Sequence, residues 1–119
     1  MARILLAEDD ESVRGFVRRA LAHHGHEITA VADGALALEA LAGEAYDLLL
    51  TDIAMPVMDG IQLALNVARD HPELRILMMS GYAEERRRAH NLDVLVHDIV
   101  SKPFSLDEIV AAVATALEG

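Results

Sequence analysis

The run Leu48-Leu49-Leu50-Thr51-Asp52 places an uninterrupted apolar stretch directly before a hydroxyl and a carboxylate. A strand that is covered on both faces carries apolar residues without alternation, as the strands of parallel sheets do. This run therefore predicts a buried parallel strand over residues 48–50. Similar short runs predict further strands over residues 4–7, 28–31, 76–79 and 99–100.

Segments with the period of a helix separate these apolar runs. The first segment places apolar residues at i, i+3, i+4, i+7 and i+8, which form one face of a helix: Val13, Phe16, Val17, Ala20 and Leu21. Helices are also predicted over residues 35–41, with Asp33 as N-cap, over 61–68, and over 84–91, the last one short and weak. A capping box, Ser105 with Glu108 three residues later, starts a final helix that extends to Leu117.

Five strands that alternate with five helices indicate an α/β fold with a doubly wound, mostly parallel sheet and right-handed crossovers. For so short a chain the flavodoxin-like strand order 2-1-3-4-5 is favoured. The 119 residues suffice for one domain, and the sequence contains no repeat and no linker-like tract. We therefore expect a single domain over residues 1–119, without an effector domain.

Charge and composition exclude several classes of protein. The formal net charge of -10 opposes binding to a phosphate backbone, so no nucleic-acid partner is expected. The sequence has no apolar run of about 18 residues, so no membrane span is expected. The absence of cysteine is compatible with a reducing compartment, and we expect a cytoplasmic protein.

Acidic residues follow two of the predicted strands. Glu8, Asp9 and Asp10 end the first strand, and Asp52 ends the third, which is its neighbour in the proposed order. Clustered carboxylates repel one another unless a cation or a proton relieves the repulsion. An open site with few carboxylates suits Mg²⁺, which keeps several of its waters. Taken alone, these acids are also compatible with a solvated loop or a helix cap.

Ser80 and Lys102 follow the fourth and fifth strands and favour a phosphoryl site. A hydroxyl and an ammonium can hold phosphoryl oxygens from the side opposite a metal ion. Lys102 is the only lysine among ten cationic residues. A flavodoxin-type cofactor site is disfavoured because the acids after the first strand would repel its phosphate. A haloacid-dehalogenase-type phosphatase needs a second acid two residues after the nucleophile, where this chain has Ala54.

Four segments resemble the signature segments of response-regulator receiver domains, the CheY-like superfamily, and they occur in the same order. They are ILLAEDD at residues 4–10, LTDIAMPVMDG at 50–60, MMSGYA at 78–83 and SKPF at 101–104. The resemblance covers essentially the whole chain, and the second segment is the most specific. The segments are also similar to those of stand-alone receivers of the CpdR type.

The resemblance implies a role for each strand-end residue. Asp52 corresponds to the phosphorylated aspartate. Asp9, Asp52 and the backbone carbonyl of Ala54 correspond to the Mg²⁺ ligands, and Glu8 to an acid that reaches the ion through water. Ser80 and Lys102 correspond to the family's hydroxyl and lysine. The Lys102–Pro103 peptide bond is expected to be cis.

The function implied is that of a two-component phosphorelay response regulator. Asp52 would take a phosphoryl group from a sensor histidine kinase or a histidine phosphotransfer protein in a Mg²⁺-dependent reaction. An output protein would then read a switched surface. Such a chain is a phosphoacceptor that slowly dephosphorylates itself, and it is not a turnover enzyme. The alternatives are a metal-dependent phosphatase that uses Asp52, a receiver that is never phosphorylated, and a fragment of a longer hybrid kinase or regulator.

Two features depart from the usual receiver. Ile99 occupies a position that is often aromatic, and the stretch 86–98 lacks the usual Gly-Ala pair. We therefore expect phosphorylation to be transmitted mainly through the loop 80–85 and the following helix. Arg86, Arg87 and Arg88 are interpreted either as the solvated face of this helix or as a docking patch.

Overall fold

Five parallel strands form one sheet in the order β2-β1-β3-β4-β5, as predicted. The computed structural model describes residues 2–92 and 94–118, so both ends of the expected domain 1–119 lie outside the described residues. The strands are β1 (Arg3–Ala7), β2 (Glu27–Val31), β3 (Leu48–Asp52), β4 (Arg75–Ser80) and β5 (Asp98–Ser101). Each includes its predicted range, and β3 also includes Thr51 and Asp52 at its carboxyl end.

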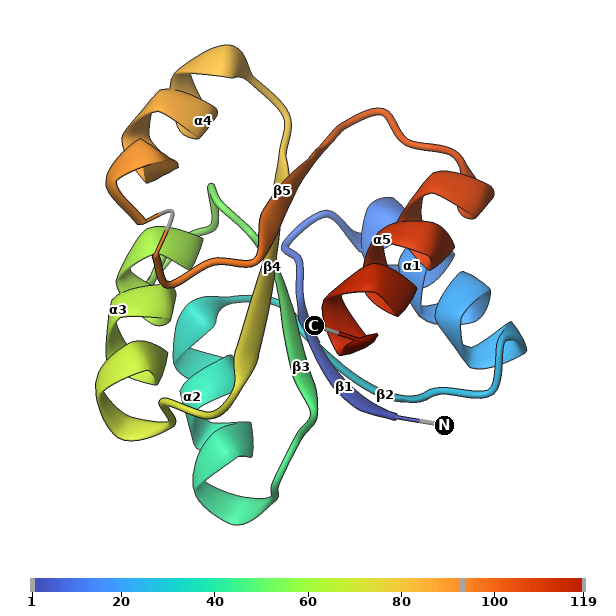
Figure 1. Cartoon of the computed structure of the whole chain (residues 1–119), viewed down its shortest axis with the longest axis horizontal. Coiled ribbons are helices and arrows are strands. Elements are labelled where there is room, and N and C mark those ends of the chain that lie inside the picture. The colour runs from blue at the N-terminus through green and yellow to red at the C-terminus, as the bar shows by residue number, and fades with distance from the viewer. Residues whose placement is uncertain (1, 93, 119) are drawn as a thin grey trace.

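Helices cover both faces of the sheet (Figure 1). They are α1 (Glu11–His23), α2 (Gly34–Gly43), α3 (Gly60–Asp70), α4 (Ala83–Ala89) and α5 (Leu106–Glu118). One core lies under α1 and α5, and the other lies under α2, α3 and α4. Successive residues of β3 alternate between them, since Leu48 and Leu50 belong to the first core and Leu49 to the second. This explains why residues 48–50 of β3 are apolar without alternation.

Side chains cap several helices, and the caps at Asp33 and Ser105 are those that the sequence predicts. Asp33 accepts a hydrogen bond from Leu36 N, and Asp10 accepts from Ser12 N and Val13 N. The capping box at α5 is confirmed in both directions, between Ser105 and Glu108. None of the described helices is long and apolar enough to span a bilayer.

The fourth helix is shorter than its predicted range of 84–91. It ends at Ala89, and a 3₁₀ turn, His90–Leu92, follows it. Tyr82, in the N-cap position, makes no side-chain hydrogen bond to the helix. A seven-residue helix without such a cap depends on tertiary contacts for its stability.

The loop between β3 and α3 brings two segments of backbone unusually close together. Gly60 N donates to Ile53 O at 2.7 Å. A Cβ atom at Gly60 would overlap the carbonyl oxygen of Asp52, so a residue without a side chain is required there. In the same loop Val57 has φ of 67°, a left-handed conformation that costs a β-branched residue about 1–2 kcal/mol.

We predict that Gly60→Ala destabilises the protein by about 2–3 kcal/mol, because the added methyl meets rigid backbone and not a flexible side chain. Gly43→Ala is the matched control, since no atom lies within 4 Å of a Cβ built there. The control is expected to be neutral or slightly stabilising. Urea denaturation of both variants tests the difference, and equal free energies of unfolding would contradict it.

Candidate functional site

The predicted site residues other than Ser80 line one cleft of about 660 Å³ at the carboxyl edge of the sheet. The cleft brings together Glu8 and Asp9 after β1, Asp52 at the end of β3, Ala54 in the following loop, and Lys102 after β5. Its apolar wall includes Val13, Phe16 and Phe104. The strand order therefore unites residues that lie far apart in the sequence.

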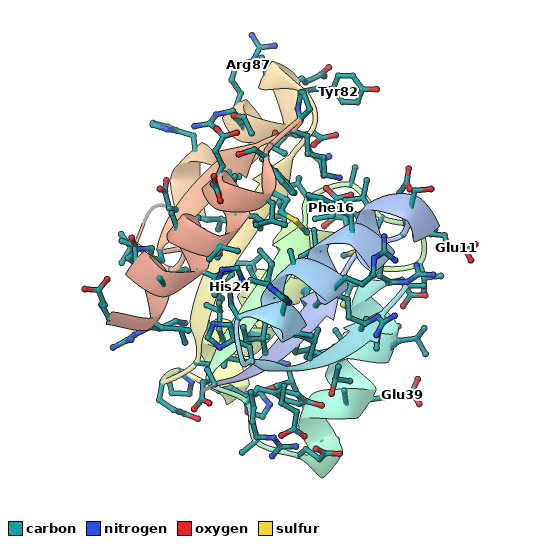
Figure 2. All side chains as sticks on the ribbon, turned by 90° about the vertical axis from the view of Figure 1, so that its right-hand side faces the viewer. Glu11, Phe16, His24, Glu39, Tyr82 and Arg87 are labelled. Atoms are coloured by element: carbon teal, nitrogen blue, oxygen red, sulfur yellow. The ribbon has the colours of Figure 1, made fainter. Side chains whose placement is uncertain are left out.

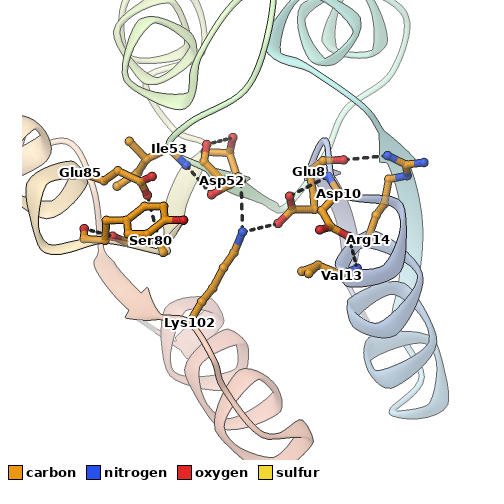
Figure 3. Close-up of polar contacts among 12 residues, drawn as sticks. Glu8, Asp10, Val13, Arg14, Asp52, Ile53, Ser80, Glu85 and Lys102 are labelled. Carbon is orange, nitrogen blue, oxygen red and sulfur yellow. Dashed lines mark hydrogen bonds and ion pairs between the residues drawn. The ribbon is translucent and has the colours of Figure 1, made fainter.

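The Lys102 ammonium joins the two buried acids at the bottom of this cleft (Figure 3). Lys102 Nζ lies 2.8 Å from Glu8 Oε1 and 3.1 Å from Asp52 Oδ2. The side chain of Glu8 is fully buried, and that of Lys102 is 21% exposed. Burial lowers the pKa of Lys102, but the contacts with Glu8 and Asp52 outweigh this effect, so the pKa of Lys102 is raised and its positive charge is secured.

Glu8 is held by the loop that follows it and by the first turn of α1. Its Oε2 accepts a hydrogen bond from Asp10 N at 3.0 Å, and its backbone carbonyl accepts one from Arg14 at 2.9 Å. Its Oε1 has Lys102 as a charge partner but no aligned hydrogen-bond donor among the described residues. This buried oxygen is therefore held by the ion pair with Lys102.

Carboxylate oxygens of Glu8, Asp9 and Asp52 lie within 4.8 Å of one another. Two of these residues are buried and Asp9 is exposed, so the cluster opens towards solvent. A set of oxygen donors with one open side fits a hard divalent cation such as Mg²⁺. The structure thus brings together the acids that the sequence assigned to Mg²⁺.

Asp52 lies at the end of a central strand and is only 5% exposed. Its Oδ1 accepts a hydrogen bond from Ile53 N at 3.0 Å, while Oδ2 faces Lys102. Burial and the neighbouring charge of Glu8 raise the pKa of Asp52 to about 7, although Lys102 opposes the shift. Without a metal ion, the site thus resists full ionisation of its two buried acids.

Ser80 is buried at the end of β4, but its hydroxyl is turned away from the carboxylates. It donates to Tyr82 O at 2.9 Å. Among residues 80–82, it is Gly81 and Tyr82, and not Ser80, that line the cleft. The hydroxyl must therefore leave Tyr82 before it can reach a group bound at Asp52.

Two residues for which the sequence predicted no role in the site make contacts in it or close to it. Glu85 of α4 is buried, lines the cleft and accepts a hydrogen bond from Gly81 N at 2.9 Å. Arg86 reaches across to β5, where it donates to Ser101 Oγ at 2.8 Å and Ile99 O at 3.3 Å. Arg86, Arg87 and Arg88 are all exposed, as expected for a solvated helix face, and Arg88 also pairs with Asp59 at 2.8 Å.

Comparison with known proteins places the whole site inside one family match. A family model described as response regulator receiver domain matches residues 4–114, a range that contains every predicted site residue. The response regulator receiver protein CpdR of Brucella abortus is 42% identical over 110 residues, which is 92% of each chain. The DNA-binding transcriptional regulator NtrC of Escherichia coli is 37% identical over 114 residues, which is 96% of this chain but 24% of NtrC.

A solved structure shows the same likeness in three dimensions. The response regulator TrrA of Thermotoga maritima, in complex with Mg²⁺-BeF, matches with a TM-score of 0.89 and 27% identity. The match covers 98% of this chain and all of that chain. The two chains therefore share one fold over nearly the whole of this chain.

We predict that the metal-free protein becomes more stable as the pH falls through about 7. The pKa of Asp52 is about 7 in the folded protein and near 3.8 in the unfolded chain, so between these values the folded state binds the additional proton. The free energy of unfolding, measured in chelator, should therefore rise from about pH 8 to about pH 5 relative to that of Asp52→Asn. Parallel profiles of the two proteins would show that Asp52 is not perturbed.

We also predict that millimolar Mg²⁺ raises the melting temperature of the wild-type protein, because the ion relieves repulsion among the clustered carboxylates. Asp9→Asn should be no less stable without the ion and should lose most of the response. Glu39→Gln, which removes the same charge from an exposed position on α2, should respond like the wild type. If Asp9→Asn shows the same rise in melting temperature with Mg²⁺ as the wild type, the ion binds somewhere other than at this acidic cluster.

Proposed function

Because the chain belongs to the response regulator receiver family, whose members act in two-component phosphorelays, we propose that Asp52 is its phosphoacceptor. The observation that carries this proposal is the position of Lys102, whose ammonium lies 2.8 Å from Glu8 and 3.1 Å from Asp52. Cation and nucleophile thus stand together at the bottom of an open cleft. The Mg²⁺-BeF complex of TrrA supports a metal and phosphoryl site of this kind.

In the proposed reaction an Asp52 carboxylate oxygen attacks the phosphorus of a phosphohistidine in line with the leaving nitrogen. The new oxygen–phosphorus bond makes an acyl phosphate, and the electron pair of the broken phosphorus–nitrogen bond returns to the imidazole. Lys102 then donates to a phosphoryl oxygen, and Ser80 donates to another after it has left Tyr82. Hydrolysis by water later returns the free carboxylate.

Glu8, Asp9 and Asp52, with the backbone carbonyl of Ala54, are the groups that would hold Mg²⁺. When bound, the ion supplies positive charge that offsets the charge on the phosphoryl oxygens. The 2.8 Å contact of Glu8 with Lys102 suits the role in which Glu8 acts on the ion through water. Glu8 would then fix the ammonium directly.

The proposed phosphodonor is a sensor histidine kinase or a histidine phosphotransfer protein, and the proposed readout is binding of an output protein. We place these events in the cytoplasm, where such donors act. The likeness to CpdR over 92% of each chain favours a stand-alone receiver, whereas NtrC carries the same region as 24% of its length. The native mass of the endogenous product distinguishes a stand-alone protein from a fragment.

An aspartyl phosphatase is the second candidate, since Asp52 could pass its phosphoryl group to water repeatedly. The switch is favoured because Ala54 stands where an acid of that chemistry is needed. Phosphate release from acetyl phosphate under single-turnover and multiple-turnover conditions separates the two. A receiver hydrolyses its acyl phosphate slowly, so each chain releases about one phosphate during the measurement. An enzyme releases many phosphates per chain, at about 1 s⁻¹ or faster.

We predict that Asp52→Asn abolishes phosphoryl incorporation from acetyl phosphate or from a phosphohistidine donor, because the amide is not nucleophilic. Removal of Mg²⁺ by a chelator should have the same effect on the wild type. Asp70→Asn, an exposed change of equal charge at the end of α3, is the control and should label normally. Normal labelling of Asp52→Asn would overturn the proposal.

A further inference from the structure

Glu85 is a buried carboxylate for which the phosphotransfer reaction has no use. It lies in the first turn of α4 and lines the same cleft as Asp52 and Lys102. Its Oε1 accepts a hydrogen bond from Gly81 N at 2.9 Å (Figure 3). Glu84, the preceding residue on the same helix, is exposed, so only one of the two neighbouring acids is turned inward.

The hydrogen-bond donor that Glu85 occupies stands beside the phosphoryl site. Asp52 pairs with Met79 in the register of the sheet, and Gly81 follows two residues later at the rim of the cleft. Backbone N–H groups bind phosphoryl oxygens strongly when water is largely excluded. In this structure Gly81 N–H donates to a carboxylate, which carries the same sign of charge as the phosphoryl group.

The Glu85–Gly81 contact is linked to the rest of α4 through the carbonyl of Tyr82. This oxygen lies 2.9 Å from Ser80 Oγ, 3.1 Å from Glu85 N and 3.4 Å from Arg86 N. Arg86, the next residue along the helix, holds β5 through Ser101 and Ile99. A displacement of the first turn therefore changes both contacts of α4, one with the site and one with the edge of the sheet.

We propose that Glu85 is a positioning residue that holds Gly81 N–H in the unphosphorylated protein and is expelled when an anion binds at Asp52. The inference rests on Asp52 as the phosphoacceptor. A phosphoryl group and the Glu85 carboxylate compete for one donor, and their like charges prevent both from staying. Glu85 therefore opposes occupation of the site, and its expulsion carries the signal into α4 and Arg86.

The test measures binding of beryllofluoride at a fixed Mg²⁺ concentration to the full chain. Glu85→Ala removes both the charge and the acceptor, so the concentration for half-saturation should fall about five- to thirtyfold. Glu85→Gln keeps an oxygen for Gly81 N–H but removes the charge, and it should also bind more tightly than the wild type. Glu84→Gln, with the same charge change on the exposed side, should stay within about twofold of the wild type.

The NMR chemical shift of the Gly81 backbone amide provides a second readout. A general loosening of the helix would not reproduce the changes expected in it. Without ligand, this signal should be close to its wild-type position in Glu85→Gln and displaced in Glu85→Ala. On addition of Mg²⁺ and beryllofluoride, all three proteins should converge on one position. Melting temperatures show whether each variant is folded, and Glu85→Gln decides the question if Glu85→Ala is not.

Folded Glu85 variants that bind beryllofluoride no more tightly than Glu84→Gln would overturn the role of Glu85 and leave Asp52 as the acceptor. If the wild type does not bind beryllofluoride, or if Asp52→Asn binds it equally well, the proposed function fails and the role of Glu85 fails with it. The two failures are therefore distinguishable in one set of titrations.

Discussion

Glu8 and Asp52 are two carboxylates that the sheet holds at its buried carboxyl edge, with the ammonium of Lys102 between them. Carboxylates so placed repel each other, and burial strengthens the repulsion because little water is present to screen it. The ammonium lies within 3.1 Å of both acids and offsets part of this cost. One negative charge remains in excess when both acids are ionised. The site consequently favours a further cation and, once that cation is bound, an anion.

The remainder of the fold can be understood as the support for this cluster. A parallel sheet that is covered on both faces brings the ends of β1, β3 and β5 to one edge without exposing the apolar strands. The close approach of Gly60 to the backbone of Asp52 fixes the loop that follows Asp52. By contrast, α4 has seven residues and no side-chain cap at its N-terminus. The rigid and the adjustable sides of the site therefore lie on different elements.

Much of this arrangement is predictable from the sequence, because the signals are local and repeated. Uninterrupted apolar runs predict the strands, the alternation with helices predicts the strand order, and that order brings Glu8, Asp52 and Lys102 to one edge. The capping box at Ser105 is likewise a signal within four residues. These inferences depend only on which residues face the core and on where each strand ends.

The contacts of α4 are not predictable in the same way. Glu84 and Glu85 are chemically identical neighbours, and only the rotation of a short helix decides which of them is buried. Arg86 and Arg87 differ in the same manner, since Arg86 bonds to β5 whereas Arg87 projects into solvent at the end of the molecule where Tyr82 also lies (Figure 2). The left-handed conformation of Val57 also has no local signal, because a β-branched residue rarely adopts it.

The reach of Arg86 to the carbonyl of Ile99 has a consequence for association between molecules. β5 lies at the margin of the sheet, where unpaired backbone groups can recruit a strand from another chain. Here the strand is four residues long, and the guanidinium of Arg86 donates a hydrogen bond to one of its carbonyl oxygens. The sheet thus ends in a short margin with a cationic side chain across it, a form poorly suited to the addition of a sixth strand and to edge-to-edge aggregation.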